Sequence, residues 1–159
     1  MNMDKKLSPD ANGTLRISYG SVADYTPAEN KKYMYFSTID EMVKHADESA
    51  TNPDFTIPDT LKQLIKNNDF GGYAQNGTIN TCFLTNMDVS WGNAGSPVIN
   101  AKGELIGVCF DVNWEATSSS IAFDDKLQRS VNTDIRYILF VIEKLGNAKN
   151  LISEMTLKN

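Results

Sequence analysis

A glycine-rich loop of chemical interest lies at residues 90–100, SWGNAGSPVIN, and follows the pattern Gly92-x-x-Gly95-x-Pro97. In acyl transfer, negative charge develops on a carbonyl oxygen, and backbone N–H groups preset about 3 Å away stabilise it. Glycines permit the tight turn that aims such groups, and proline fixes the exit into the next strand. The pattern therefore fits an oxyanion-binding loop. A glycine-rich turn that only joins two strands fits it equally well.

An acidic residue, Asp111, follows the apolar run at residues 105–110. A carboxylate at the end of an apolar strand is well placed to pair with an ammonium group in a semi-buried cleft. Aspartates at strand ends also make local turn hydrogen bonds. The residues alone favour this second interpretation of Asp111.

The first half of the chain predicts one β segment and two helices that would support these residues. Residues 14–26 alternate apolar and polar types around a central glycine, which predicts a strand with a kink or a hairpin. Residues 38–50 have apolar positions at helical spacing, with Thr38 as N-cap and Glu41 three residues later, and predict a helix. Residues 58–68 predict a second, shorter helix that begins with a proline.

The centre of the chain has the patterns of β structure. Residues 79–86 predict a strand, and residues 95–112 predict two strands joined by a tight turn at 100–103. The second of these strands is almost entirely apolar over residues 105–110, so both its faces are expected to be covered.

The last part of the chain is predicted to be helical. Residues 133–146 carry one apolar stripe, with Thr133 or Asp134 at the start and Gly146 as the stop, and a second short helix is expected over 148–155. The order is β, small helices, β and a terminal helix packed on the β part. This order fits a partly open barrel better than alternating parallel units.

Composition and charge narrow the class of protein. The chain has 159 residues, enough for one domain with a core, and its net charge of -5 argues against a nucleic-acid partner. No apolar run reaches the roughly 20 residues needed to span a bilayer. The opening residues MNMDKKLSPDANG contain no apolar signal region, so no secretory signal is visible.

The two cysteines predict neither a metal site nor a disulfide framework. Cys82 and Cys109 have no metal-ligand spacing and are expected to be buried thiols. A bridge between them is the alternative if the chain works outside the cytoplasm. No metal and no cofactor are expected.

Two long runs carry a family resemblance. Residues 85–116, TNMDVSWGNAGSPVINAKGELIGVCFDVNWEA, and residues 121–155 closely resemble the C-terminal part of the bacterial dipeptidyl-peptidases of serine peptidase family forty-six. That family includes dipeptidyl-peptidases seven and eleven and removes dipeptides from free peptide N-termini. It has a chymotrypsin-like double barrel with an inserted helical domain. The resemblance implies a mainly β fold with helices: residues 1–132 as the second barrel with small helical insertions, and residues 133–159 as a C-terminal helical brace.

The resemblance also shows what catalytic groups this sequence lacks. The family's nucleophilic serine falls at Ala94, and a methyl group cannot attack a carbonyl. Ser96 matches the family's own second serine in the loop and is not expected to replace it. The family's catalytic histidine and aspartate lie in the first barrel, upstream of these residues. The single histidine, His45, matches no family motif and is expected to be a partly exposed helix residue. Gly92 and Ala94 would keep the oxyanion N–H groups.

Substrate-binding residues are implied at the family's F-D-x-N segment. Asp111 would accept the peptide's N-terminal amine, Val112 would border the pocket for the P1 side chain, and Asn113 joins this set. In the family, glycine at the Val112 position accompanies bulky apolar P1 residues and arginine accompanies acidic ones, so valine predicts small to medium apolar residues. Trp114 is expected to be a core residue. Arg136 is expected to pair with a carboxylate.

Two functions follow from the resemblance. The first is the C-terminal catalytic half of a serine dipeptidyl-peptidase, inactive as it stands. The second is a non-catalytic pseudo-enzyme that binds peptide N-termini or a partner chain. A split double barrel would expose an apolar face, so a missing first barrel or a second copy of the chain is an expected partner. The family implies a periplasmic or cell-surface location.

Overall fold

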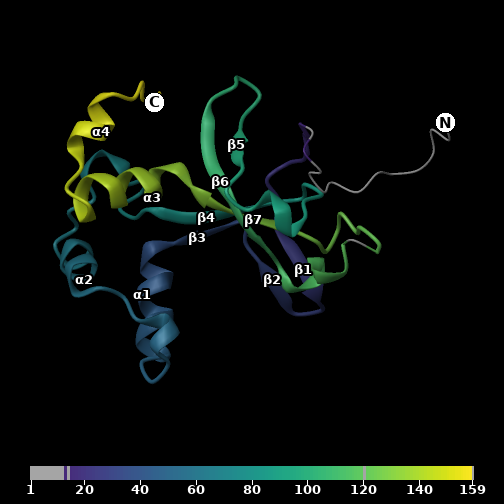
Figure 1. Ribbon diagram of the computed structural model, residues 1–159. Coiled ribbons are helices and arrows are strands. Elements are labelled where there is room, and N and C mark those ends of the chain that lie inside the picture. The colour runs from purple at the N-terminus through teal and green to yellow at the C-terminus, as the bar shows by residue number, and fades with distance from the viewer. Residues whose placement is uncertain (1–12, 14, 120, 159) are drawn as a thin grey trace. The chain divides into compact units, whose positions relative to one another are not determined.

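The computed structural model describes residue 13 and residues 15–119 and 121–158 (Figure 1). The chain divides into two compact units that are interleaved in sequence. Unit 1 comprises Met1–Tyr35, Leu84–Val98 and Val108–Asn132, and unit 2 comprises Phe36–Phe83, Ile99–Gly107 and Thr133–Asn159. The division at residue 132 expected from the family resemblance stays a prediction.

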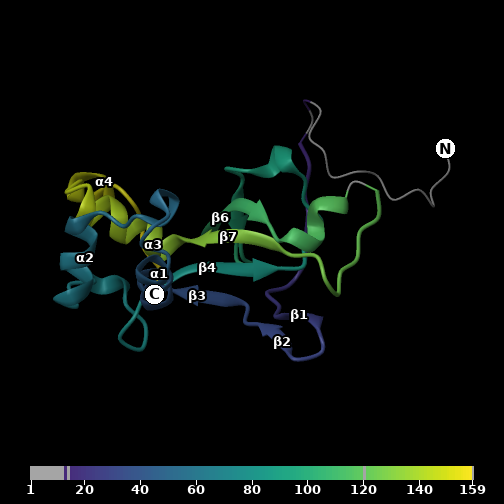
Figure 2. The same ribbon diagram turned by 90° about the horizontal axis from the view of Figure 1, so that it is seen from below.

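Two sheets form the β structure. The strands are β1 (Tyr25–Ala28), β2 (Lys31–Tyr33), β3 (Phe36–Thr38), β4 (Asn80–Thr85), β5 (Pro97–Ile99), β6 (Leu105–Val112) and β7 (Ser130–Asp134). β1 and β2 make an antiparallel hairpin, and the other five have the order β3-β4-β7-β6-β5, in which β3, β4 and β7 are seen side by side in Figure 2. The prediction of sheets with helices is confirmed. Over the described residues the five-stranded sheet is open and does not close into a barrel.

The helix after β3 begins where the sequence predicts. α1 runs over Ile39–Glu48, and its N-cap Thr38 accepts a hydrogen bond from the N–H of Glu41 at 3.4 Å. The Glu41 carboxylate in turn accepts from the Thr38 N–H at 2.8 Å, which completes a capping box. α2 follows at Asp59–Lys66, also as predicted.

The C-terminal helices are also confirmed. α3 (Ile135–Phe140) follows β7 directly (Figure 1), and its N-cap is Asp134, whose carboxylate accepts from the N–H of Arg136 at 2.9 Å. The helix continues as a π-helical turn over Val141–Leu145 that ends at Gly146, and α4 covers Lys149–Ser153. The core of unit 2 gathers apolar side chains from α1, α2, α3, the link before α2 and the 70–79 segment: Ile39, Ala46, Ile57, Leu61, Phe70, Tyr73, Ile79, Leu139 and Phe140.

The strand predicted over residues 14–26 is wrong for most of its length. Residues 15–20 have no regular structure, and only Val22 makes an isolated bridge, to Thr85. Asn86 pairs with Ser21 through both its side chain and its main chain: Oδ1 accepts the Ser21 N–H at 2.7 Å, and the Asn86 N–H donates to Ser21 O at 3.0 Å. A side chain at Gly20 would also collide with Asn86, since a Cβ there would lie 2.5 Å from Oδ1. The main-chain pairing of this segment is therefore short and surrounds the single bridge at Val22, through Ser21 and Ala23.

The apolar stretch of β6 is not covered on both faces as expected. Cys109 is buried, whereas Leu105 is 46% and Phe110 is 66% exposed. Leu105, Gly107 and Cys109 share one face of β6, which is buried at Gly107 and Cys109 and exposed at Leu105, while Phe110 lies exposed on the other face. The prediction treated an apolar composition as evidence for two covered faces, which composition alone cannot supply.

One central strand, β7, was not predicted. Its sequence SVNTD is polar, yet Ser130 and Asn132 are fully buried. Their polar groups form hydrogen bonds with Thr85 in the neighbouring strand β4. The Ser130 and Thr85 hydroxyls are hydrogen-bonded, and Asn132 Nδ2 donates to Thr85 Oγ1 at 3.2 Å. A strand held by buried polar groups has no apolar alternation for a sequence pattern to detect.

A titrating contact in unit 2 leads to a pH prediction. The Tyr73 hydroxyl donates to Glu143 Oε2 at 2.5 Å. Burial is the larger cause and this hydrogen bond the next cause that raise the Tyr73 pKa to about 12. Because the folded-state pKa exceeds the unfolded value of about 10, this stability is fully present below pH 10 and is lost as pH rises toward 12. The loss over this range is on the order of 1–3 kcal/mol.

Tyr73→Phe is expected to flatten the fall in unfolding free energy between pH 10 and pH 12, as urea unfolding at pH 9, 10, 11 and 12 would measure. Tyr19→Phe is the matched control, since Tyr19 is 89% exposed. Equal slopes for the wild type and Tyr73→Phe would contradict the prediction.

Candidate functional site

The loop at residues 90–96 is fixed by its own side chains. It forms a 3-10 turn over Trp91–Asn93 with Ser90 as N-cap. Asn93 Oδ1 accepts from the Ser90 N–H at 2.8 Å and from Ser90 Oγ at 3.2 Å, and the Asn93 N–H donates to Ser90 O at 2.9 Å. Ser90 and Asn93 therefore hold each other in the turn that precedes Ala94, the predicted nucleophile position.

The second half of the loop is attached to β6. Gly95 has a φ of +87°, in the left-handed region that favours glycine, and its N–H donates to Cys109 O at 2.8 Å. The Cys109 N–H donates back to Ser96 O at 2.8 Å. Gly92, one of the two expected oxyanion donors, lies within the 3-10 turn, and Ala94, the other, follows its end.

Three of the predicted site residues line one small hollow in unit 1. Ala94, Asp111 and Val112 surround it together with Val89, Ser90, Cys109 and Phe110. Its volume is about 10 Å³, which is room for about one water. The structure thus brings together the predicted nucleophile position, the predicted amine-binding carboxylate and the predicted P1 residue. The hollow is too small to enclose a peptide side chain.

Asp111 combines exposure with one local hydrogen bond. The residue is exposed, and its Oδ1 accepts the Val112 N–H at 2.8 Å. This is the turn-type bond that the residues alone favoured. The Asp111 charge also acts on a neighbour that lines the hollow. Burial is the larger cause and the Asp111 charge the smaller cause of a raised pKa of the Cys109 thiol. A carboxylate in this position can attract an ammonium group.

Asn113 uses its carboxamide inside the protein. It is buried, its Nδ2 donates to Leu127 O and to Glu115 Oε2, each at 2.8 Å, and its Oδ1 accepts the Arg129 N–H at 2.8 Å. These bonds give Asn113 a role in holding the chain that follows β6. A direct contact of Asn113 with substrate stays a prediction.

Other residues singled out from the sequence behave differently from one another. Trp114 is 84% exposed, so the prediction of a core residue is wrong. The tryptophan follows the end of β6 in a 3-10 turn and has left the buried face. Arg136 does pair with a carboxylate: its Nε lies 2.8 Å from Asp134 Oδ1 and its Nη2 lies 2.5 Å from Oδ2. His45 is an exposed helix residue beside Phe55, and Cys82 and Cys109 are free thiols.

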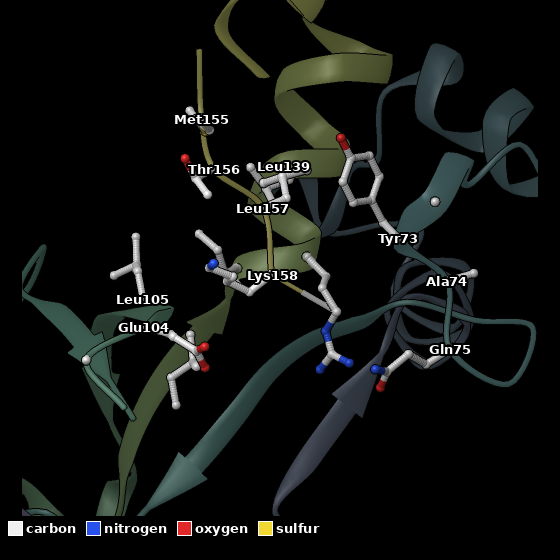
Figure 3. Close-up of a pocket in the computed structure, with 15 residues that line it drawn as sticks. Tyr73, Ala74, Gln75, Glu104, Leu105, Leu139, Met155, Thr156, Leu157 and Lys158 are labelled. Carbon is white, nitrogen blue, oxygen red and sulfur yellow. The ribbon is translucent and has the colours of Figure 1, made fainter. Parts of the chain in front are cut away.

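A much larger cavity, about 820 Å³, lies in unit 2 and is shown in Figure 3. Three of the four ionisable side chains at its wall are engaged within the protein, namely Arg136 with Asp134, Glu104 with Asn100 Nδ2 at 2.7 Å, and Tyr73 with Glu143; the fourth is Lys158. Size alone therefore favours this cavity, whereas the chemistry favours the hollow beside Ala94. We place the candidate site at the hollow.

Sequence reasoning assigned no role to Arg129. The residue is buried at 5% exposure, and its guanidinium donates only to main-chain carbonyls. The one feature of the sequence that could have indicated a role for Arg129 is the Gln128-Arg129 pair, which directly precedes β7. No periodic pattern distinguishes such an arginine from a surface one.

The described residues contain no group of three or more histidine, cysteine, aspartate or glutamate side chains that could hold a metal ion. Within the same part of the chain, every helix is too short or too polar to cross a membrane.

Comparison with known proteins identifies the family. The family Peptidase S46 matches residues 1–157, and the chain belongs to it. Dipeptidyl-peptidase 7 of Phocaeicola vulgatus is 50% identical over 151 residues, which is 94% of this chain and 21% of the relative. The Asp/Glu-specific dipeptidyl-peptidase of Porphyromonas gingivalis is 40% identical over 158 residues, 99% of this chain and 22% of the relative.

Solved structures agree with this assignment. The crystal structure of Porphyromonas endodontalis DPP11 in complex with the dipeptide Arg-Asp is 38% identical, with a TM-score of 0.88 over 96% of this chain and 22% of that chain. Another structure of DPP11 holds the dipeptide Arg-Glu, with a TM-score of 0.86 and 40% identity over 93% of this chain and 21% of that one. The chain spans about a fifth of the length of the relatives that it matches.

Proposed function

We propose that this chain supplies the nucleophile-loop and amine-binding portion of a serine dipeptidyl-peptidase, with alanine in place of the nucleophile. The observation that carries the proposal is the meeting of Ala94, Asp111 and Val112 around one hollow. The names of the relatives, dipeptidyl-peptidase 7 and Asp/Glu-specific dipeptidyl-peptidase, support removal of dipeptides from peptide N-termini as the activity of the longer proteins.

The chain by itself binds without hydrolysing. Ala94 has no atom that can attack a carbonyl, and the one histidine, His45, lies in α1, outside the hollow. A serine without a positioned base is a weak nucleophile, so even Ala94→Ser leaves the isolated chain without turnover. We assign binding of the substrate carbonyl oxygen to the N–H groups of Gly92 and Ala94, as the family resemblance implies.

Peptide recognition depends on charge at one end of the dipeptide and on size at the other. Asp111 pairs with the free ammonium group of the peptide. Val112 has no positive charge for an acidic P1 side chain, and its branched bulk narrows an apolar pocket. We therefore assign small to medium apolar P1 residues to this chain.

The remaining family features belong to the same proposal. In the longer protein the strands described here form part of the second chymotrypsin-like barrel, with residues 133–159 as a helical brace. The location is the periplasm or the cell surface.

The second candidate is a pseudo-enzyme that binds peptide N-termini or a partner chain. The observation in its favour is the set of large apolar side chains exposed in unit 1, namely Leu15, Ile17, Tyr19, Phe110 and Ile121, exposed by 66–91%. Exposed apolar surface of this kind marks an interaction site on many proteins. A missing first barrel or a second copy of the chain would cover it.

An NMR titration tests the proposal. The isotopically labelled chain is titrated with a dipeptide amide that carries a free N-terminus and an apolar P1 residue, and separately with its N-acetylated twin. We expect only the free amine to shift the Ala94, Asp111 and Val112 resonances.

Asp111→Asn provides the control, because it keeps the shape and removes the charge. A charge-assisted hydrogen bond contributes about 1.5–3 kcal/mol, so the variant is expected to bind the free-amine peptide about 10–100-fold more weakly. Equal binding of the two peptides, or equal affinity of Asp111→Asn and the wild type, would refute amine recognition by Asp111.

A further inference from the structure

The Arg129 side chain joins two segments of unit 1 that are distant in sequence. Its Nη2 donates to Asp24 O at 2.7 Å and its Nε donates to Ala23 O at 3.2 Å. Within its own segment, Nη1 donates to Asp125 O and to Gln128 O, each at 2.7 Å, and Nη2 also donates to Lys126 O at 3.2 Å. The planar guanidinium, with five N–H donors, suits this set of carbonyls.

The Tyr25 ring completes the setting of this guanidinium. The Arg129 Cζ atom lies 5.8 Å from the Tyr25 ring centroid, within reach of a cation–π interaction. All the hydrogen bonds described for the guanidinium end on main-chain oxygens, so the side chain fixes backbone positions and does not neutralise a particular carboxylate through a direct bond. The segment 125–129 is thereby held against the segment 23–25.

The main chain of Arg129 carries this constraint to the candidate site. The Arg129 N–H donates to Asn113 Oδ1 at 2.8 Å, and the Asn113 N–H donates to Arg129 O at 2.9 Å. Asn113 Nδ2 adds a bond to Leu127 O at 2.8 Å. Asn113 directly follows Val112 and lies two residues after Asp111, so the end of β6 is tied to the segment that Arg129 fixes.

We propose that Arg129 is a positioning residue for the peptide-binding site: through Asn113, it holds Asp111 and Val112 beside the Ala94 loop. The inference rests on the proposed function for its binding consequence, but its structural part concerns the unliganded chain. Without the guanidinium, the 125–129 segment loses its attachment to Ala23 and Asp24, and the end of β6 loses its fixed partner. The carboxylate of Asp111 then samples several positions and pairs less well with an ammonium group.

The test uses Arg129→Lys in the full 159-residue chain. Lysine keeps the positive charge, but its ammonium has three donors on one atom and cannot reproduce the five contacts of the guanidinium. Arg136→Lys is the matched control, since Arg136 belongs to unit 2 and pairs with Asp134.

We expect Arg129→Lys to bind the free-amine peptide at least tenfold more weakly than the wild type, with the Val112 and Asn113 amide resonances displaced before any peptide is added. We also expect Asn113 N–H exchange to speed up at least tenfold, and Arg136→Lys to change none of these quantities. A folded Arg129→Lys chain whose affinity lies within twofold of the wild type would overturn the proposal.

The two proposals fail in different ways. If the wild type does not distinguish the free from the acetylated peptide, amine recognition fails, and the resonances and exchange rates of the unliganded variants still decide the role of Arg129. If Arg129→Lys does not fold, exchange in the wild type decides: the N–H groups of Asn113 and Arg129 are expected to be protected and to open together. An unprotected Asn113 N–H would overturn the proposal.

Discussion

Gly107→Ala is expected to destabilise the chain by more than about 3 kcal/mol, because β6 has no room for a methyl group at this position. A Cβ at Gly107 would lie 2.5 Å from Thr133 O and 2.7 Å from Phe83 Cε1. The first neighbour is a backbone oxygen of β7, and the second belongs to a ring that is itself buried at 7% exposure. Relief of the first contact requires the two strands to separate, which breaks their pairing.

Urea unfolding measures this loss, and two variants separate its causes. Gly72→Ala is the matched control, since a Cβ there would meet nothing within 4 Å, and we expect a change within about 0.5 kcal/mol. Phe83→Ala combined with Gly107→Ala removes the ring contact and keeps the collision with Thr133 O. The double variant should therefore lose less unfolding free energy than the two single variants lose in sum. It should still be less stable than Phe83→Ala alone. A single Gly107→Ala variant within 1 kcal/mol of the wild type would contradict this account.

Local rules predict the helices of this chain well. The capping box at Thr38 and Glu41, the N-cap at Asp134 and the stop at Gly146 each depend on residues within a few positions of one another. The turn at residues 100–103 is also local, with the Gly103 N–H donating to Asn100 O at 3.0 Å. Each of these features forms from short-range hydrogen bonds, so the order of the residues is enough to locate it.

The strands show where sequence patterns fail. β7 has almost no apolar alternation, because its buried positions Ser130 and Asn132 are satisfied by Thr85, 45 or more residues away. Residues 15–19 have the opposite property: they alternate well, yet they form no strand. Both outcomes depend on a distant partner that no local pattern contains.

The candidate site likewise has residues that the sequence predicts and contacts that it does not. Ala94, Asp111 and Val112 could be found by comparing motif positions with a family, and the structure places them around one hollow. Comparison of motif positions could not reveal how that hollow is attached to the rest of unit 1, because Arg129 binds main-chain oxygens. A carbonyl acceptor has no residue type, and such a contact therefore leaves no mark in the sequence of its partner.

Phe140→Ala is expected to cost about 3–5 kcal/mol of unfolding free energy, because it opens a cavity in the core of unit 2. Phe140 is 0% exposed, and its ring lies 6.2 Å from that of Phe70 in an edge-on arrangement and 6.4 Å from that of Tyr137, between centroids. A domain has only about 5–15 kcal/mol of net stability, so this one change removes a large part of it.

The comparison with Phe55→Ala isolates burial as the cause. Phe55 belongs to the same unit and loses the same atoms, but it is 42% exposed, so we expect its unfolding free energy to fall by less than about 1 kcal/mol. Phe140→Leu should recover more than half of the alanine loss, because leucine refills most of the cavity. Equal losses for Phe55→Ala and Phe140→Ala would mean that the packing of Phe140 against Phe70 and Tyr137 does not stabilise unit 2. A cost confined to Phe140 would instead show that α3 is held by its buried face, which fixes the helix that follows directly from β7.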